Sequence, residues 1–149
     1  MPDDGLLRRV DAVQVPVPSL DEGLAFYVEA LGHRLLWRND DLGQAGLQLP
    51  DGDSELVLTT TSPYEPNWLV NDVPAAIATI TDRGGTLVTG PLDIPVGRVA
   101  VVQDPFANPL VLVDLSKGLY ATTPDGTITG VRPTPSAAPG GDGGFGEPA

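Results

Sequence analysis

Residues 13–38, VQVPVPSLDEGLAFYVEALGHRLLWR, combine a strand, a complete helix and the start of a second strand in one short stretch. Apolar and other side chains alternate over residues 13–17, which is typical of a β-strand. Ser19, with a glutamate three residues later, matches a capping box, and Gly32 is a typical helix end. A helix is therefore predicted over residues 20–31. Its apolar face would carry Leu20, Leu24, Tyr27 and Leu31.

The same order of patterns returns after a shift of 53 residues. A second helix is predicted from Val73, with Ile77 and Ile80 on its apolar face and Gly84-Gly85 at its end. Strand-like runs follow the two helices, at 34–38, 45–49 and 55–60 in the first half and at 86–89, 98–103 and 110–114 in the second. The sequence thus predicts an α+β protein of two βαβββ modules. Both helices would pack on one side of a mixed, curved sheet, leaving a cupped site on the other side.

The C-terminal end of the chain differs in composition from the rest. Residues 131–149 are dominated by Pro, Gly and Ala, which indicates a disordered tail. A single domain is predicted over residues 7–130, with its two modules at about 9–62 and 64–118.

Charge and composition exclude several kinds of partner. The chain has 20 acidic against 8 basic residues, a net charge of −12, and no basic stripe, which argues against nucleic-acid binding. No apolar run reaches the roughly 20 residues of a membrane-spanning helix. There is no cysteine, so disulfides and thiolate metal sites are excluded. The acidic N-terminus does not look like a secretory signal, and a cytoplasmic location is expected.

Three stretches resemble the vicinal oxygen chelate superfamily, the glyoxalase/bleomycin resistance/dioxygenase proteins. The first is residues 13–38, with its Ser19-Leu20, Phe26-Tyr27 and Leu31-Gly32 pairs. The second is LVNDVPAAIATITDRGG at 69–85, and the third is DPFANPLVLVDLSKG at 104–118, with Ala107 where the family usually has glycine. The resemblance covers roughly residues 9–118. It implies paired βαβββ modules around a cupped site, usually in a homodimer.

In the metal-dependent members of that family, the resemblance implies one divalent ion held by side chains from four strands. The corresponding positions here are Ala12, Thr59, Glu65 and Val111. Of these residues only Glu65 is a good cation ligand, and one carboxylate does not hold an ion firmly. No metal and no cofactor are therefore expected. A two-residue slip of the alignment would bring Gln14 or Asn67 into the site instead.

Several side chains are candidates for lining a ligand pocket, and each has a structural alternative. Gln14 and its repeat partner Asn67 either point into the site or lie on a solvated sheet face. Glu65 either lines the site or belongs to a turn, and Trp37 either edges the pocket or packs in the core. The predicted ligand-binding set is Gln14, Trp37, Thr59, Glu65, Asn67 and Val111. His33, the single histidine, is expected to be structural.

Two classes of function follow from these residues. The first is a metal-free small-molecule-binding protein similar to the bleomycin-resistance branch of the family. The second is a glyoxalase-type metal-dependent lyase, isomerase or dioxygenase, which would have to recruit Glu65 and Gln14 around a metal, or else an enzyme of that type that uses Glu65 as a lone base. No catalytic residue is assigned, and whether the protein is an enzyme is left open. The partners expected are a small molecule and a second copy of the chain.

Overall fold

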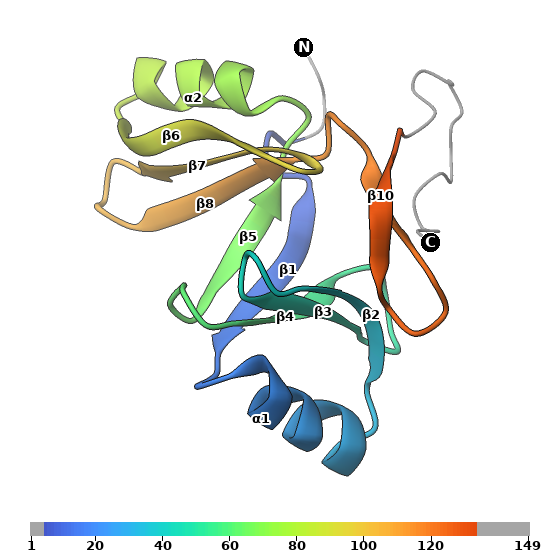
Figure 1. Ribbon diagram of the computed structural model, residues 1–149. Coiled ribbons are helices and arrows are strands. Elements are labelled where there is room, and N and C mark those ends of the chain that lie inside the picture. The colour runs from blue at the N-terminus through green and yellow to red at the C-terminus, as the bar shows by residue number, and fades with distance from the viewer. Residues whose placement is uncertain (1–4, 134–149) are drawn as a thin grey trace.

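The computed structural model describes residues 5–133, and its elements follow the predicted order (Figure 1). The first module contains β1 (Arg9–Pro16), α1 (Leu20–Leu24), η1 (Ala25–Ala30), β2 (Arg34–Asn39), β3 (Gln44–Gln48) and β4 (Glu55–Thr59). The second contains β5 (Glu65–Leu69), α2 (Val73–Asp82), β6 (Thr86–Ile94), β7 (Gly97–Gln103) and β8 (Pro109–Asp114). A hairpin of β9 (Leu119–Thr122) and β10 (Ile128–Arg132) follows. The predicted α+β class with two βαβββ modules is confirmed.

Eight strands form one mixed sheet in the order β2-β3-β4-β1-β5-β8-β7-β6. Within the modules β1 pairs with β4, and β5 with β8, in parallel, and the two modules join where β1 and β5 run antiparallel. Val13 pairs with Pro66 at the centre of that junction. The equivalent positions Gln14 and Asn67 each follow this pair by one residue, Gln14 on β1 and Asn67 on β5. The junction therefore brings the repeated polar positions onto neighbouring strands. That the sheet forms a cup stays a prediction.

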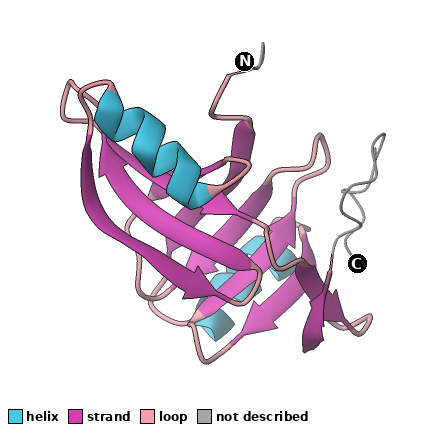
Figure 2. Cartoon of the chain, turned by 90° about the horizontal axis from the view of Figure 1, so that it is seen from above, coloured by secondary structure: helices cyan, strands magenta, loops and turns pink. Residues whose placement is uncertain are grey.

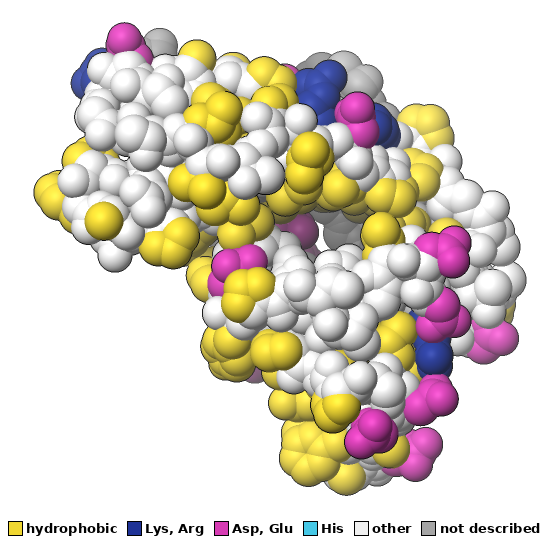
Figure 3. All heavy atoms as spheres, turned by 60° about the vertical axis from the view of Figure 1, so that its left-hand side comes forward, with side chains coloured by type: hydrophobic (Ala, Val, Ile, Leu, Met, Phe, Trp, Pro, Cys, Tyr) yellow, Lys and Arg dark blue, Asp and Glu magenta, His cyan; other side chains and the backbone are white. Residues whose placement is uncertain are grey.

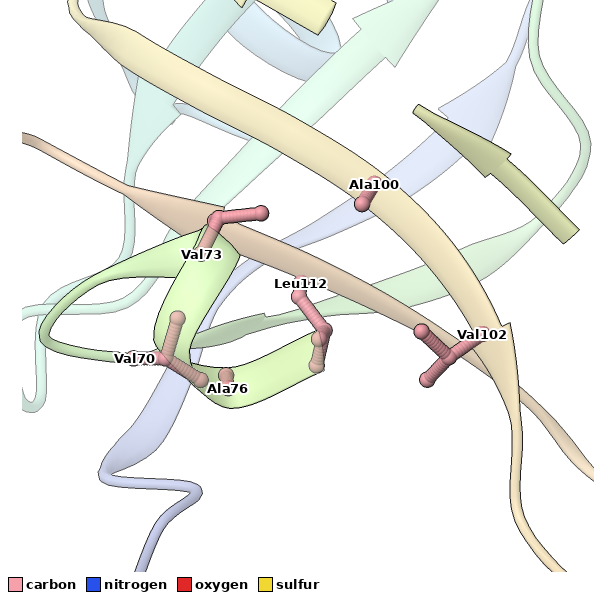
Figure 4. Close-up of a cluster of buried hydrophobic side chains, with 6 residues drawn as sticks. All are labelled: Val70, Val73, Ala76, Ala100, Val102 and Leu112. Carbon is pink, nitrogen blue, oxygen red and sulfur yellow. The ribbon is translucent and has the colours of Figure 1, made fainter. Parts of the chain in front are cut away.

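Each module has its own hydrophobic core beneath its helix. The core under α2 consists of Val70, Val73, Ala76, Ala100, Val102 and Leu112 (Figure 4). The core under α1 consists of Leu20, Ala45, Leu47 and Leu58. Figure 2 shows α2 lying across the strands of the second module. Along each strand, successive side chains point to opposite faces of the sheet. Every second side chain of β1, β4, β5 and β8 therefore points to the face away from the helices.

The first helix differs from its prediction in its second half. Ser19 caps it as expected, accepting a hydrogen bond from the Glu22 amide at 3.1 Å. Beyond Leu24, however, the chain winds as a π-helix, which has more residues per turn than an α-helix. The predicted apolar face is therefore lost at its end, and Leu31 is 52% exposed.

The sequence interpretation missed the C-terminal hairpin. The hairpin turn has Gly126 at φ +92°, and Asp125 accepts a hydrogen bond from the Thr127 amide at 3.1 Å. β10 ends at Arg132, beyond the predicted domain end at residue 130. Residues 134–149 of the predicted tail lie outside the described residues. Within residues 5–133, no helix has the length and apolar character needed to cross a membrane.

Candidate ligand-binding cavity

A cavity of about 600 Å³ lies on the side of the sheet away from the helices. Both modules and the C-terminal hairpin contribute to its wall. On β8, Leu112 packs under α2, whereas Val111 and Val113 line the cavity. This alternation explains why β8 is apolar on both of its faces. Figure 3 shows one face of the molecule, where the surface is hollowed and hydrophobic side chains (yellow) gather around the hollow.

Two amide side chains in the cavity wall have a buried oxygen without a partner. Gln14 is 8% exposed, and its Oε1 accepts no hydrogen bond. The Oδ1 atom of Asn67, on the neighbouring strand, is likewise buried and without a partner. A buried polar atom left unpaired costs about 1–3 kcal/mol. Neither oxygen has accessible surface as it stands, so a ligand N–H or O–H group removes that penalty only after the amide turns its oxygen toward the cavity.

Glu65 stands directly opposite Gln14 in the β1–β5 register. Its side chain lines the cavity, and burial raises the pKa of its carboxyl above the ordinary value. Val111 faces Asn67 on the next strand, which places an apolar side chain beside the second amide. The centre of the cavity floor therefore places two amide side chains and a carboxyl group next to an apolar wall.

Glu55 and Asp11 are acidic cavity residues that the sequence interpretation did not identify. The Glu55 carboxylate accepts a hydrogen bond from Trp37 Nε1 at 2.8 Å. Burial raises the pKa of Glu55 from its ordinary 4.5 to about 7, although the Trp37 hydrogen bond opposes the rise. The pKa of Asp11 is also raised by burial, against the opposing effect of Arg9. The signal in the sequence was the position of Glu55 two residues before Val57, on the same strand face.

Trp37 lies in the cavity wall and makes a second contact there, with an aromatic ring. Its ring centroid is 5.0 Å from that of Tyr120, on β9, with 44° between the ring planes. Burial raises the pKa of the Tyr120 hydroxyl, which accepts a hydrogen bond from Asn39 Nδ2 at 3.5 Å. Tyr120 belongs to the missed hairpin, so the sequence interpretation did not connect it with Trp37.

Thr59 is the predicted site residue that the structure places elsewhere. It does not line the cavity, and it is fully buried. Its Oγ1 accepts hydrogen bonds from the amides of Thr61 and Ser62, both at 3.1 Å. The β1–β4 register places Val57, not Thr59, beside Gln14. Thr59 therefore stabilises the turn after β4, and Val57 takes the wall position.

Two other residues have structural surroundings. The Nδ1 atom of His33 lies 3.2 Å from the backbone carbonyl oxygen of Gln48, where it donates in the matching tautomer. Trp68 packs against the core under α2. The surroundings of His33 agree with its expected structural role.

The side chains of the cavity do not fit a divalent ion held by four strands. Ala12 and Val111 have no donor atoms, and Thr59 is turned into its own loop. Among residues 5–133, no group of three or more His, Cys, Asp or Glu side chains is placed to hold a metal ion. The remaining donors are separate carboxylates and amides, a poor match to the nitrogen and oxygen sets that bind transition metals.

Comparisons with known proteins identify the family. The family model of the Glyoxalase/Bleomycin resistance protein/Dioxygenase superfamily matches residues 9–112. The chain belongs to this superfamily. No curated protein sequence matches it.

Solved structures with the same fold include two epimerases. Methylmalonyl-CoA epimerase from Mycobacterium tuberculosis is 22% identical, with a TM-score of 0.59 over 76% of this chain and 92% of that one. Streptomyces coelicolor methylmalonyl-CoA epimerase, in complex with 2-nitronate-propionyl-CoA, is 22% identical, with a TM-score of 0.57 over 72% and 97%. TnmS3, an antibiotic binding protein from Streptomyces sp. CB03234, is 29% identical over 75% and 99%, with a TM-score of 0.35.

Proposed function

We propose that this protein binds a small organic molecule in the cavity, without a metal ion, in the manner of a bleomycin-resistance-type binding protein. The observation that carries the proposal is the pair of unpartnered amide oxygens, Gln14 Oε1 and Asn67 Oδ1, in the cavity wall. Proteins rarely leave buried acceptors unpaired, because each loses its hydrogen bonds to water. A ligand donor restores them once the amide has turned its oxygen toward the cavity.

The remaining wall defines the class of ligand. A volume of about 600 Å³ is in the range of pockets for drug-sized molecules. Val57, Val99 and Val101 add to the apolar lining, so the ligand is partly hydrophobic. Its polar part carries hydrogen-bond donors rather than acceptors. Anionic ligands are disfavoured, since the cavity wall carries the carboxyl groups of Asp11 and Glu65 and the whole chain has a net charge of −12.

An enzyme is the second candidate, and Glu55 is the observation that favours it. A cavity carboxyl with a pKa of about 7 has the property needed in a general base at neutral pH. The donor set of the cavity gives no support to the metal-assisted form of such a reaction. Turnover of a bound ligand, abolished by Glu55→Gln with binding retained, would establish the enzymatic alternative.

A thermal-shift screen tests the binding proposal. The library contains neutral heterocycles, antibiotics with amino groups and small oxo-acids. A ligand present at 100 times its dissociation constant stabilises the folded protein by about 2.7 kcal/mol. The expected hits carry N–H or O–H donors, and Gln14→Leu and Asn67→Leu are expected to weaken them at least tenfold.

Gln48→Leu is the matched control, because Gln48 is an exposed glutamine on β3 outside the cavity. It is expected to leave every ligand shift unchanged. Ligands that stabilise the wild type, Gln14→Leu and Asn67→Leu equally would refute the assignment of the two amides.

A further inference from the structure

The β9–β10 hairpin lies outside residues 9–112, the part of the chain that matches the family. It nevertheless forms one side of the cavity, through Leu119, Tyr120, Thr122, Thr123 and Pro124. In Figure 1 the hairpin lies beside β2, at the edge of the sheet. Part of the wall that surrounds a ligand is therefore an addition to the two modules.

The hairpin is attached to β2 by backbone and side-chain contacts. The Arg38 amide donates to the Gly126 carbonyl oxygen at 3.1 Å, and Arg38 pairs with Thr127 in a parallel bridge. The aromatic rings of Trp37 and Tyr120 pack together on the cavity side of this attachment. Tyr120 thus has a defined position in the wall.

Trp37 is also held from its other edge. A glycine at position 46, directly opposite Trp37 on β3, leaves room for the indole, since a Cβ there would overlap Trp37 and Glu55. The indole can therefore cross β3 and donate to Glu55, on β4. Trp37, Tyr120 and Glu55, from three different strands, form one corner of the cavity, which we call the aromatic–carboxylate corner.

We propose that the aromatic–carboxylate corner binds the ammonium group of a cationic ligand, an inference that rests on the proposed binding function. Aromatic faces attract cations through their quadrupoles, and a carboxylate adds a full opposite charge. The two rings touch each other, so the cation lies against their cavity-facing surfaces and not between them.

The charged groups around the corner have a negative balance. Asp11 lies near Glu55 on the neighbouring strand and affects its pKa. Arg9, on the same strand, is shared between Asp11 at 3.9 Å and Asp53 at 4.0 Å. Arg34 also belongs to the cavity wall, with an exposed side chain. The hairpin adds no basic residue to the wall, and the Glu55 carboxylate lies at the indole N–H of Trp37.

Choline and its uncharged isostere, 3,3-dimethylbutan-1-ol, test this inference because they have almost the same shape. Binding is followed by the fluorescence of Trp37 in the full chain carrying Trp68→Phe, which leaves Trp37 as the single tryptophan. At pH 8, choline is expected to bind at least tenfold more tightly than the isostere. Glu55→Gln, which keeps an acceptor for the indole N–H, is expected to reduce that preference below threefold.

Tyr120→Leu is expected to reduce the preference as well, whereas the control Tyr64→Leu, at a tyrosine that is 71% exposed and outside the cavity, leaves it unchanged. Equal binding of the two probes, no binding of either at 20 mM, or an unchanged preference in Glu55→Gln overturns the inference. The proposed function fails separately, if hits from the thermal-shift screen do not depend on Gln14 and Asn67. A ligand whose binding depends on Gln14, found together with no preference for choline, would support the proposed function and overturn the proposal for the aromatic–carboxylate corner.

Discussion

Glu55→Gln is expected to make the protein more stable at pH 8 and to leave it unchanged or slightly less stable at pH 4.5. The substitution removes a carboxyl that must ionise inside the cavity wall, yet it keeps the oxygen that accepts from Trp37 Nε1 at 2.8 Å in the wild type. It therefore isolates the cost of the charge from the loss of a contact.

The magnitude follows from the pKa. The Glu55 carboxyl has a pKa of about 7 in the folded protein, against 4.5 for an ordinary glutamate. The folded state thus holds its proton more tightly than the unfolded chain does, so stability decreases as the pH rises from 4.5 to 7 and is level above 7. At about 1.4 kcal/mol per pKa unit, the upper bound is about 3 kcal/mol. Because Glu55 lines an open cavity that water can enter, about 1–2 kcal/mol is expected.

Urea unfolding of the wild type and the variant between pH 4.5 and 8.5, followed by circular dichroism, measures the difference. The difference in the free energy of unfolding, Glu55→Gln minus wild type, should grow from pH 4.5 to pH 7 and then remain constant. The control is Glu29→Gln, at an exposed glutamate, for which the same growth is not expected. A Glu55→Gln difference that is flat with pH would refute the claim that Glu55 is forced to ionise in an unfavourable place.

Three further substitutions test other parts of the structure by urea unfolding. Gly46→Ala is expected to destabilise the protein by about 1–3 kcal/mol and to shift the Trp37 emission, because the new methyl group overlaps the indole; unchanged stability and emission would contradict this packing. Asp114→Asn is expected to cost about 1–3 kcal/mol at pH 7, since Asp114 is fully buried and accepts from the Val73 amide at 2.7 Å. Burial alone would raise the pKa of Asp114, but its hydrogen bonds lower it below the ordinary value of 3.8. The Asp114 carboxylate therefore stabilises the folded protein above pH 3.8, and this stabilisation is lost as the pH falls below that value. A loss of stability that begins above pH 6 would contradict the assignment. Ala107→Gly is expected to stabilise by up to about 1 kcal/mol, because Ala107 has φ +72° in a region that favours glycine; a destabilised variant would contradict that reasoning.

The fold was predictable because its signals are local. Alternation over residues 13–17, the Ser19 cap and the Gly32 end each depend on a few adjacent residues, and the repeat shows that the same unit occurs twice. The end of the first helix was less predictable, since the change from α to π winding leaves no mark in the apolar spacing that ends at Leu31.

The cavity was predictable only in part. Gln14, Trp37, Glu65, Asn67 and Val111 all lie in its wall, although their role in binding stays a prediction. Thr59 was misplaced, because a pairing between strands depends on register, which the residues of one strand do not contain.

Glu55 and Tyr120 were missed for a related reason. They lie 18 and 83 residues after Trp37 in the chain, and their contacts with it depend on a glycine opposite the indole and on a hairpin beyond the repeat. The sequence does contain a turn signal for that hairpin, Pro124-Asp125-Gly126, between two short strand-like runs.

The most direct measurement is a crystal structure of the protein with the tightest-binding ligand from the thermal-shift screen. A nitrogen or hydroxyl group of the ligand is predicted to lie within about 3.2 Å of Gln14 Oε1, with a second donor near Asn67 Oδ1. A ligand bound outside the cavity, or a metal ion in the cavity coordinated by three or more protein atoms, would contradict a metal-free site built on these two amides.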